Sequence, residues 1–584
     1  MQPTSKLSAT AVFKRIRSYC ASQYDVPQFI NELKSLLVQD FGSTFSVVRN
    51  RKLITQWKSL PTTSFVCSEL RNWLLSAPLS GKRKAQFRSH LGVCEFIQAV
   101  FDEIDADAQK LGIWSSEPDA FLRTILGFVE YQSTAIDEKI PELDSGSSPQ
   151  SLDAADKNVL RLRLSHDLIR DVSDGACIIL AQFALRHLGA CTGAPNEKEI
   201  REAFELAKRK DLIQQFFDNY SYLGWQAKIF GHTISFKAPH PDQLLLDYYR
   251  QQLITAGDQF DSVSEIALRM RLRRDKQHAT PTDFDGMPFA EFLECPDGKK
   301  ILNNGEKVAT ELTKKIRKRI LEVFEETAKL HSSEGCYTIR ELVDTWGFLS
   351  SFAYCAEQWT RSMIRRSRAE AFRTYAPIVK KDTLITLLSA RLTISNQRAD
   401  DLLRQFMIRD QNGGDWDLFY RPLVPLAGSD IGVASSFIGL SRFYRNVFSI
   451  AIRDTDTDLS ARGFKPLSAL REKFLSAGFR AGTNKAVCVG GREITDVDFF
   501  FLLDQVLFIA QVKVLLEPDS AYEKWKVMTK LTRANEQLQR TMDNLPGLMG
   551  ICLMTSECLM KSASVLDSPF RLSFVTLNTR QDLG

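Results

Sequence analysis

Four polar residues in two otherwise apolar runs are the part of the sequence best suited to chemistry. Asp496 and Asp498 lie in the first run, and Gln511 and Lys513 lie in the second. Side chains two residues apart on a strand share a face, so each pair points to one side. Burying such groups among apolar residues costs free energy unless they are paired or hold a metal. The pattern therefore predicts a buried polar site.

Oxygen donors at these positions suit a divalent cation such as Mg²⁺ or Mn²⁺. The predicted ligands are the Asp498 carboxylate, the side-chain oxygen of Gln511 and the main-chain carbonyl of Val512. Asp496 is an alternative ligand, because it lies on the same face as Asp498. The metal would polarise a phosphodiester and lower the pKa of a bound water. Lys513 would orient that water or stabilise the charge that builds on the phosphate.

The segments around these residues predict the order helix, strand, strand, strand, helix, strand. The two central runs are so apolar that burial on both faces is expected. A tight turn between them would lay the two polar pairs side by side. The predicted elements are a helix over Pro466–Ala477 ending at Gly478, extended segments over Phe479–Val489, Glu493–Leu503 and Val506–Leu516, a helix over Ala521–Arg540 and a strand over Gly547–Thr555.

This region resembles the PD-(D/E)xK nuclease superfamily, which includes restriction enzymes and Holliday-junction resolvases. The resemblance rests on Gly491–Lys513 (GREITDVDFFFLLDQVLFIAQVK), with support from the preceding helix and from Arg533–Arg540 (RANEQLQR). It covers about a fifth of the chain. The separation of Asp498 and Gln511, thirteen residues (511 minus 498), is typical of the two acidic positions of the family. The resemblance implies a restriction-endonuclease-like α/β domain with a metal-dependent centre.

The sequence departs from the family pattern at two places. Gln511 replaces the usual Glu or Asp, in a QxK form similar to that of Mrr-type restriction enzymes. Family members often carry a Glu on the first helix, where Leu467 stands here, and Glu472 falls on the helix side opposite the apolar positions. A purely structural alternative stays open. In it, backbone donors satisfy the two aspartates and Lys513 is their ion-pair partner.

Composition bounds the class of protein. At 584 residues the chain is too long for one core, and a formal net charge of +5 permits a nucleic-acid partner without requiring one. None of the eleven cysteines has a CxxC or Cys/His ligand spacing, which favours reduced thiols in the cytoplasm. No phosphate loop, HExxH pair, GxSxG elbow or GxGxxG fingerprint is present. Neither a secretory signal nor a membrane span is expected.

Periodicity predicts a multidomain chain that is mostly α-helical before its C-terminal α/β domain. Apolar residues recur at helical spacing through most of the first half, and Trp225–Ala238 alternates about Gly231-His232 like a short hairpin. The predicted regions are 1–220, a helical domain; 221–400, a hairpin plus a basic helical region; 401–458, a small β-containing unit with short strands over Asp415–Leu426 and Ile431–Leu440; and 459–584, the nuclease-like domain.

Two predicted helices, Glu306–Leu330 and Ile339–Phe372, carry runs of basic residues. Such runs are usually solvated helix faces. The functional alternative is a surface that follows a nucleic-acid backbone, although neither run contains interleaved aromatic residues that would stack on bases. The residues are Lys314, Lys315, Arg317, Lys318 and Arg319 on the first helix, and Arg361, Arg365, Arg366 and Arg368 on the second.

Two main functions follow from these patterns. The first is a metal-dependent phosphodiesterase acting on DNA, whose helical portion selects a substrate or a protein partner; the family analogy suggests genome defence or repair. The second is a binding or scaffold protein with a degenerate nuclease fold. A weaker third hypothesis is a protein-binding helical sensor that triggers its C-terminal domain.

Overall fold

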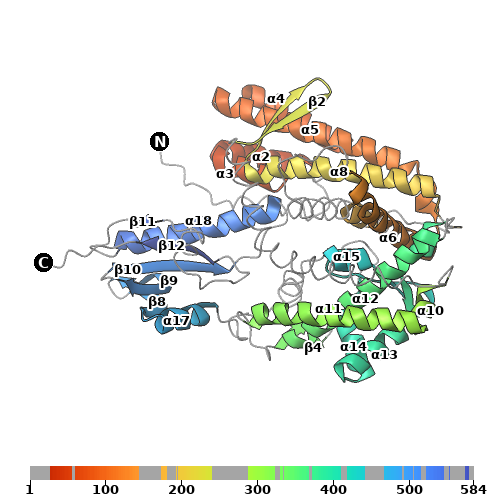
Figure 1. The fold of residues 1–584 in the computed structure, drawn as a ribbon. Helices are drawn as coiled ribbons and strands as arrows, with labels where there is room; N and C mark the ends of the chain where they lie inside the picture. Colours follow the sequence, from red (N-terminus) through yellow and green to blue (C-terminus); the bar gives the residue numbers. More distant parts are fainter. Residues whose placement is uncertain are drawn as a thin grey trace. The chain divides into compact units, whose positions relative to one another are not determined.

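The computed structural model contains two compact units, which are mainly helical with small antiparallel sheets (Figure 1). Unit 1 comprises Met1–Leu111, Glu205–Leu253 and Pro518–Lys526, and unit 2 comprises Gly112–Phe204, Ile254–Glu517 and Val527–Gly584. The four sequence regions proposed above stay a prediction. The structure describes residues 26–55, 60–143, 172–180, 193, 195–239, 287–321, 329–332, 335–366, 371–408, 417–440, 466–489, 492–503, 506–514, 521–544, 551–552 and 572–577.

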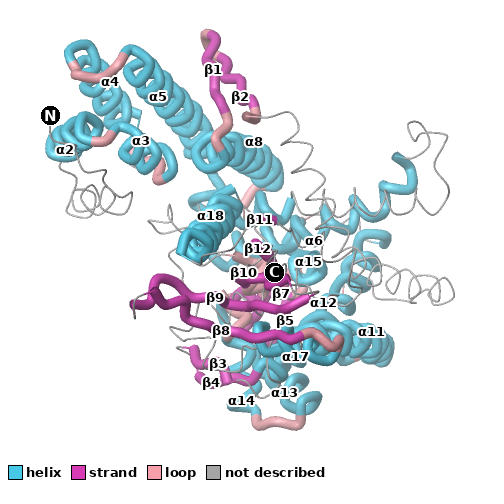
Figure 2. Tube along the Cα trace, turned by 90° about the vertical axis from the view of Figure 1, so that its left-hand side faces the viewer, coloured by secondary structure: helices cyan, strands magenta, loops and turns pink. Residues whose placement is uncertain are grey.

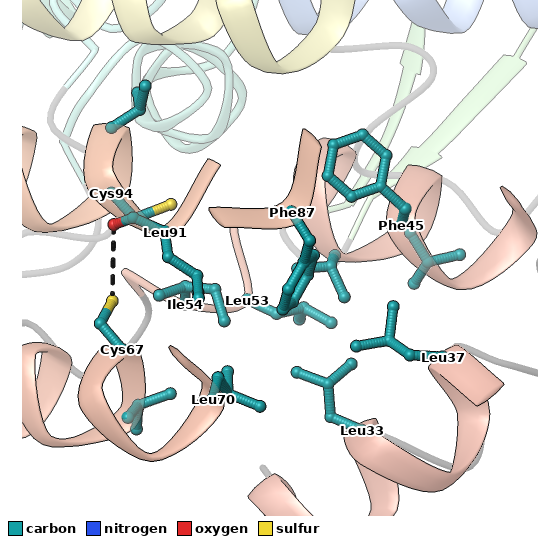
Figure 3. Close-up of a cluster of buried hydrophobic side chains, with 14 of the residues drawn as sticks. Leu33, Leu37, Phe45, Leu53, Ile54, Cys67, Leu70, Phe87, Leu91 and Cys94 are labelled. Atoms are coloured by element: carbon teal, nitrogen blue, oxygen red, sulfur yellow. Dashed lines mark hydrogen bonds between the residues drawn. The ribbon is translucent and has the colours of Figure 1, made fainter. Parts of the chain in front are cut away.

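Unit 1 is built on one hydrophobic core. Its helices are α2 (Val26–Gln39), α3 (Phe41–Asn50), α4 (Leu60–Ser76), α5 (Gly81–Gln109) and most of α8 (Glu197–Leu223). Leu33 and Leu37 of α2, Leu70 of α4, and Phe87 and Leu91 of α5 point toward one another in Figure 3, and all five are fully buried. The helical spacing of these residues gives each helix one apolar stripe, so the helices predicted here are confirmed.

The predicted hairpin of unit 1 is also confirmed. Strands β1 (Gln226–Phe230) and β2 (Thr233–Lys237) pair antiparallel, with Phe230 opposite Thr233 at the turn. The two-residue connection needs a positive φ, which Gly231 supplies at +57°. Figure 2 shows the two strands as a separate hairpin next to α8.

In unit 2, helix α6 (Pro118–Leu143) binds segments that lie far along the chain. Glu130 is buried and accepts hydrogen bonds from Ser435 and Ser436, at the start of α15 (Ser435–Leu440). Arg123 donates to Asp430 at 2.8 Å. These contacts connect α6 to a three-stranded antiparallel sheet. The order of its strands is β5 (Ile378–Lys380), β7 (Asp430–Val433) and β6 (Leu423–Pro425). The short helix η2 (Phe372–Tyr375) precedes β5, and η3 (Ala427–Ser429) lies between β6 and β7 in the chain.

Two predictions in this part of the chain are wrong in extent. The strand expected over Asp415–Leu426 is confined to β6, and the strand expected over Ile431–Leu440 ends at Val433. Residues 435–440 form α15 instead, because the hydroxyl groups of its first two serines bond to the buried carboxylate of Glu130. The Phe419 ring packs against that of Phe437 at 5.1 Å, and Trp416 lies outside the described residues.

The two basic helices of unit 2 are antiparallel neighbours. Helix α11 (Pro296–Leu321) meets α12 (Ile339–Arg366) at glycines on both, since a Cβ on Gly305 would lie 2.8 Å from the Ser351 carbonyl and a Cβ on Gly347 would lie 2.6 Å from the Thr313 methyl. The first helix was expected to reach Leu330, but that residue pairs in a β-strand, so tertiary pairing overrides helix propensity there. Around them lie α10 (Phe289–Glu294), β3 (Lys329–Ser332), β4 (Gly335–Thr338), α13 (Lys381–Leu392) and α14 (Asn396–Arg404).

The chain from Pro466 to Cys552 has the predicted order of elements. Helix α17 (Pro466–Ser476) is followed by β8 (Arg480–Val489), β9 (Arg492–Leu503), β10 (Val506–Val514), α18 (Ala521–Asn544), β11 (Ile551–Cys552) and β12 (Leu572–Leu577). All pairs are antiparallel, and the sheet order is β11-β12-β10-β9-β8. The last strand was not predicted. It lies between β11 and β10, so the second half of the sheet is assembled out of chain order.

Helix α17 ends as the sequence predicts. Gly478 adopts the left-handed conformation at φ +87°, and its N–H bonds to the Leu475 carbonyl. The N–H of Phe479 bonds to the Phe474 carbonyl, and the two rings pack at 5.6 Å, which completes a Schellman motif with its apolar contact. This motif turns the chain directly into β8. Within the described part of the chain, no helix combines the length and apolarity that a membrane crossing needs.

Candidate active site

Strand β9 carries its aspartates on one face and its buried apolar residues on the other. Val497, Phe499 and Phe501 are buried, whereas Asp496 is exposed and Asp498 is half-buried. Successive side chains of a strand point to opposite faces, so the two aspartates lie on one face of the sheet and the three buried apolar residues lie on the other. The prediction that both faces of this strand are buried is therefore wrong. An antiparallel strand can hold a core on one face while the other stays accessible.

Helix α17 covers the face away from Asp498. The Phe474 ring lies 5.1 Å from that of Phe499 and 4.7 Å from that of Phe501. Phe508 of β10 stacks on Phe501 at 4.6 Å, which extends the same aromatic layer. Figure 1 shows α18 along the opposite side of the sheet from α17. The two aspartates thus belong to the side of the sheet on which α18 runs.

The strands that carry the candidate residues diverge at the site. The last ladder pair between β9 and β10 is Phe499 with Ala510. One further step in that register sets Asp498 opposite Gln511. Here β10 continues only with β12, where Gln511 pairs with Val575, while β9 continues with β8. The expected juxtaposition of Asp498 and Gln511 therefore lies at the fork between two strands.

The side chain of Gln511 spans this fork. It is fully buried, and its Nε2 donates a hydrogen bond to the main-chain carbonyl of Asp496. This bond connects the two strands beyond the last pair of their backbone ladder. Because the amide nitrogen is the donor, the acceptor atom of the same group is Oε1, the atom predicted to bind a cation.

A third residue of the same row was not predicted from the sequence. Thr483 of β8 pairs with Phe499 and Lys485 pairs with Val497, so Asn484 between them lies opposite Asp498. Asn484 has φ +52°, in the left-handed region that few residues other than glycine adopt. Asn484, Asp498 and Gln511 therefore occupy equivalent positions on three adjacent strands. The available signal was an asparagine, a residue depleted in strands, inside an otherwise extended segment.

A glycine in β8 makes room for an aromatic ring on the aspartate face. Gly482 pairs with Phe500, and a Cβ on Gly482 would lie 2.3 Å from the ring of Phe500. The ring therefore lies directly over the glycine backbone. Asp498 lies two residues along the same face of β9.

The remaining candidates on β10 are located by their main chain. Val512 pairs with Phe574 and Lys513 pairs with Ser573, both in β12. The strand predicted to carry these residues is confirmed. Their side chains lie outside the described part of the structure.

The donor set at the fork is of the type that a hard cation takes. It consists of the Asp498 carboxylate, the Gln511 amide oxygen and main-chain carbonyls, with Asp496 exposed nearby, and these are all oxygen ligands. Within the described residues, no group of three or more His, Cys, Asp or Glu side chains is positioned to hold a metal. A cation here would therefore depend on a carboxylate together with neutral oxygens.

Helix α17 adds no acid beside Asp498. Glu472 is 69% exposed and pairs with Arg471 at 3.1 Å. The helix that carries Leu467 and Glu472 packs on the opposite face of the sheet, as its phenylalanine contacts show. Glu472 therefore does not supply the helical carboxylate that the resemblance to PD-(D/E)xK nucleases implies.

The basic candidates on α11 and α12 are described only in part. Lys314 is exposed on α11. Arg361 of α12 is 15% exposed and forms an ion pair with Glu357 at 2.7 Å. Lys315, Arg317, Lys318, Arg319, Arg365 and Arg366 lie in these helices with side chains outside the description, and Arg368 lies outside the described residues.

No family model, curated protein or solved structure matches this chain.

Proposed function

We propose that the C-terminal part of unit 2 is a restriction-endonuclease-like domain that hydrolyses phosphodiester bonds of DNA with the help of Mg²⁺ or Mn²⁺. The observation that carries the proposal is the placement of Asp498 opposite the buried Gln511, where β9 and β10 diverge. Buried polar side chains at a strand fork cost stability, so they need a compensating role. The order of helices and strands around them is also the one implied by the resemblance to PD-(D/E)xK nucleases.

In this mechanism the chain supplies oxygen ligands and a positive charge. Asp498 and the Gln511 Oε1 hold the cation, with the Val512 carbonyl as a further ligand and Asp496 as the alternative carboxylate. The bound ion supplies Lewis-acid polarisation of the phosphodiester and a more acidic water. The hydrogen bond from Gln511 to the Asp496 carbonyl orients the amide, so its oxygen is held in place. Lys513 stabilises the negative charge that develops on the phosphate.

A second function, nucleic-acid binding without cleavage, is favoured by a different feature of the same site. The amide of Gln511 already has a structural role in bridging the fork, and α17 supplies no acid there. A protein that has lost activity could retain this arrangement for stability alone. In that case the basic helices hold nucleic acid, and the C-terminal sheet acts as a scaffold.

Cleavage of linear, circular and single-stranded DNA in Mg²⁺ or Mn²⁺ tests the proposal. We expect cutting by the intact chain, a loss of at least 100-fold in Lys513→Ala and Asp498→Ala, and no cutting above background when the metal is omitted or removed by EDTA. The matched controls are Lys485→Ala and Glu493→Ala, which remove exposed side chains from β8 and β9. DNA binding without cutting by any of these proteins would favour the scaffold. We also propose that the nuclease acts in genome defence or repair, and in the cytoplasm.

A further inference from the structure

The hairpin β1–β2 has two chemically different faces. Its inner face consists of Ala227, Ile229, Ile234 and Phe236, which alternate along the two strands. Three of these residues pack against the core of unit 1, and a Cβ on Gly92 of α5 would lie 3.5 Å from the Ile229 Cδ1. The inner face therefore attaches the hairpin to the core of unit 1. The outer face takes no part in that core.

The outer face is exposed along its whole length and contains no acidic residue. Phe230 is 62% exposed beside the turn, whereas most large apolar side chains of unit 1 are buried. Every other residue of this face ends in a group that can donate a hydrogen bond. The six residues are Gln226, Lys228, Phe230, Thr233, Ser235 and Lys237.

The first turns of α5 extend this basic character. The segment from Lys82 to Arg88 contains four basic residues and no acid, and both of these end residues are exposed. Arg88 lies one helical turn before Gly92, the residue against which Ile229 packs, so it is on the α5 face nearest the hairpin. The Phe230 ring of the hairpin thus lies near basic residues of the hairpin and of α5. The basic runs of α11 and α12 lack this combination of an aromatic ring with basic residues.

We propose that the outer face of β1–β2, together with Arg88, binds a single strand of DNA. Lys228 and Lys237 are diagonal neighbours on adjacent strands, with Cα atoms about 7 Å apart, so one sugar-phosphate backbone can contact both side chains. The small polar side chains between them are of the types that donate to phosphate oxygens. Phe230 stacks on an unpaired base at the end of the hairpin.

The charge of this face selects the nucleic acid over a protein partner. The core of a protein interface is apolar around its aromatic anchors and poor in charge, whereas the other residues of this face are two lysines and three uncharged residues that can donate hydrogen bonds. The exposure of a single phenylalanine does not by itself indicate a function. The position of Phe230 on a face without acidic residues, next to Lys228, indicates a nucleic-acid contact.

Fluorescence anisotropy of a labelled single strand and of the matching duplex tests this surface. The full-length chain is used in EDTA with Lys513→Ala, so binding is measured without cleavage and independently of the nuclease proposal. The double variant Lys228→Gln/Lys237→Gln removes two phosphate contacts. We expect binding to weaken at least tenfold, and the slope of log K against log salt to fall by about 1.4.

Phe230→Ala separates base stacking from charge. We expect the single strand to bind about 5- to 100-fold more weakly, with an unchanged salt slope and little effect on the duplex. The control Lys299→Gln/Lys300→Gln removes the same charge from exposed positions on α11 and should bind as tightly as the parent. Unchanged binding by both hairpin variants, an equal loss in the control, or no DNA binding by the parent would each overturn the proposal. Matching thermal unfolding curves would exclude misfolding of the variants.

Discussion

Glu130 of α6 accepts a hydrogen bond of 2.5 Å from the Ser435 hydroxyl of α15, although 305 residues separate the two in sequence. Its other carboxylate bonds, both 2.9 Å, come from the N–H and the hydroxyl of Ser436. Burial raises the pKa of Glu130 to about 7, and these three bonds oppose the shift. The carboxyl group is thus a titratable connection between distant parts of unit 2.

This connection predicts a pH-dependent stability. Because the folded pKa lies above the ordinary value of 4.5, the folded protein keeps a proton that the unfolded chain loses. The stability contributed by Glu130 is full below pH 4.5 and is lost as the pH rises through 7. Urea unfolding at pH 5 and pH 8 should show a decrease for the natural protein that exceeds that of Glu130→Gln by on the order of 2–3 kcal/mol. Equal pH dependence in the two proteins would contradict this assignment.

A close contact between α6 and a distant backbone segment predicts a large effect of a single methyl group. A Cβ on Gly127 of α6 would lie 1.9 Å from the main-chain carbonyl of Phe372, which cannot rotate away as a side chain can. Gly127→Ala should therefore destabilise the protein by about 1–3 kcal/mol, in spite of the better helix propensity of alanine. Gly92→Ala, which meets Ile229 at 3.5 Å, is the matched helical control and should be neutral or stabilising in thermal unfolding.

The glycine beneath the aromatic ring of the candidate site makes a coupled prediction. Gly482→Ala should displace Phe500 and destabilise the sheet by about 1–3 kcal/mol, because the added Cβ overlaps the ring. Phe500→Leu in the same chain should recover part of this loss, since the smaller side chain leaves room for the methyl group. A double-mutant cycle measures the coupling. Strictly additive effects would show that the ring does not press on Gly482.

Metal binding distinguishes the two aspartates of β9. Calorimetric titration with Mn²⁺ should show a site that is lost in Asp498→Ala and weakened less in Asp496→Ala, because Asp498 is half-buried opposite Gln511 and Asp496 is exposed. The reverse order would make Asp496 the ligand. Affinity that is the same in both variants and in the natural protein would leave the scaffold as the better description.

The sequence predicted several elements well because their signals are local. The Gly478 helix end and the alternation in the hairpin each depend on a few adjacent residues, and both are confirmed. Leu503 pairs with Val506, so the tight turn predicted between the two runs sets the register, and the position of Asp498 opposite Gln511 was also predictable.

Other features depended on contacts between distant segments. The helix at 435–440 forms where a strand was expected because its serines meet Glu130 from α6, which no local pattern encodes. The exposed face of β9 was missed because apolar content alone does not tell which face a helix covers; Phe474 decides that. Asn484 was missed because its place beside Asp498 depends on the register of β8.

The hydrogen bond from Gln511 to the Asp496 carbonyl limits how this chain can change over evolutionary time. A glutamate at position 511 would restore the acidic residue common in the resembled family, but it would set a carboxylate oxygen against a carbonyl and remove the donor that closes the strand fork. Folding therefore favours glutamine at this position whether or not the site is active, so the presence of the amide alone does not reveal whether the site catalyses a reaction.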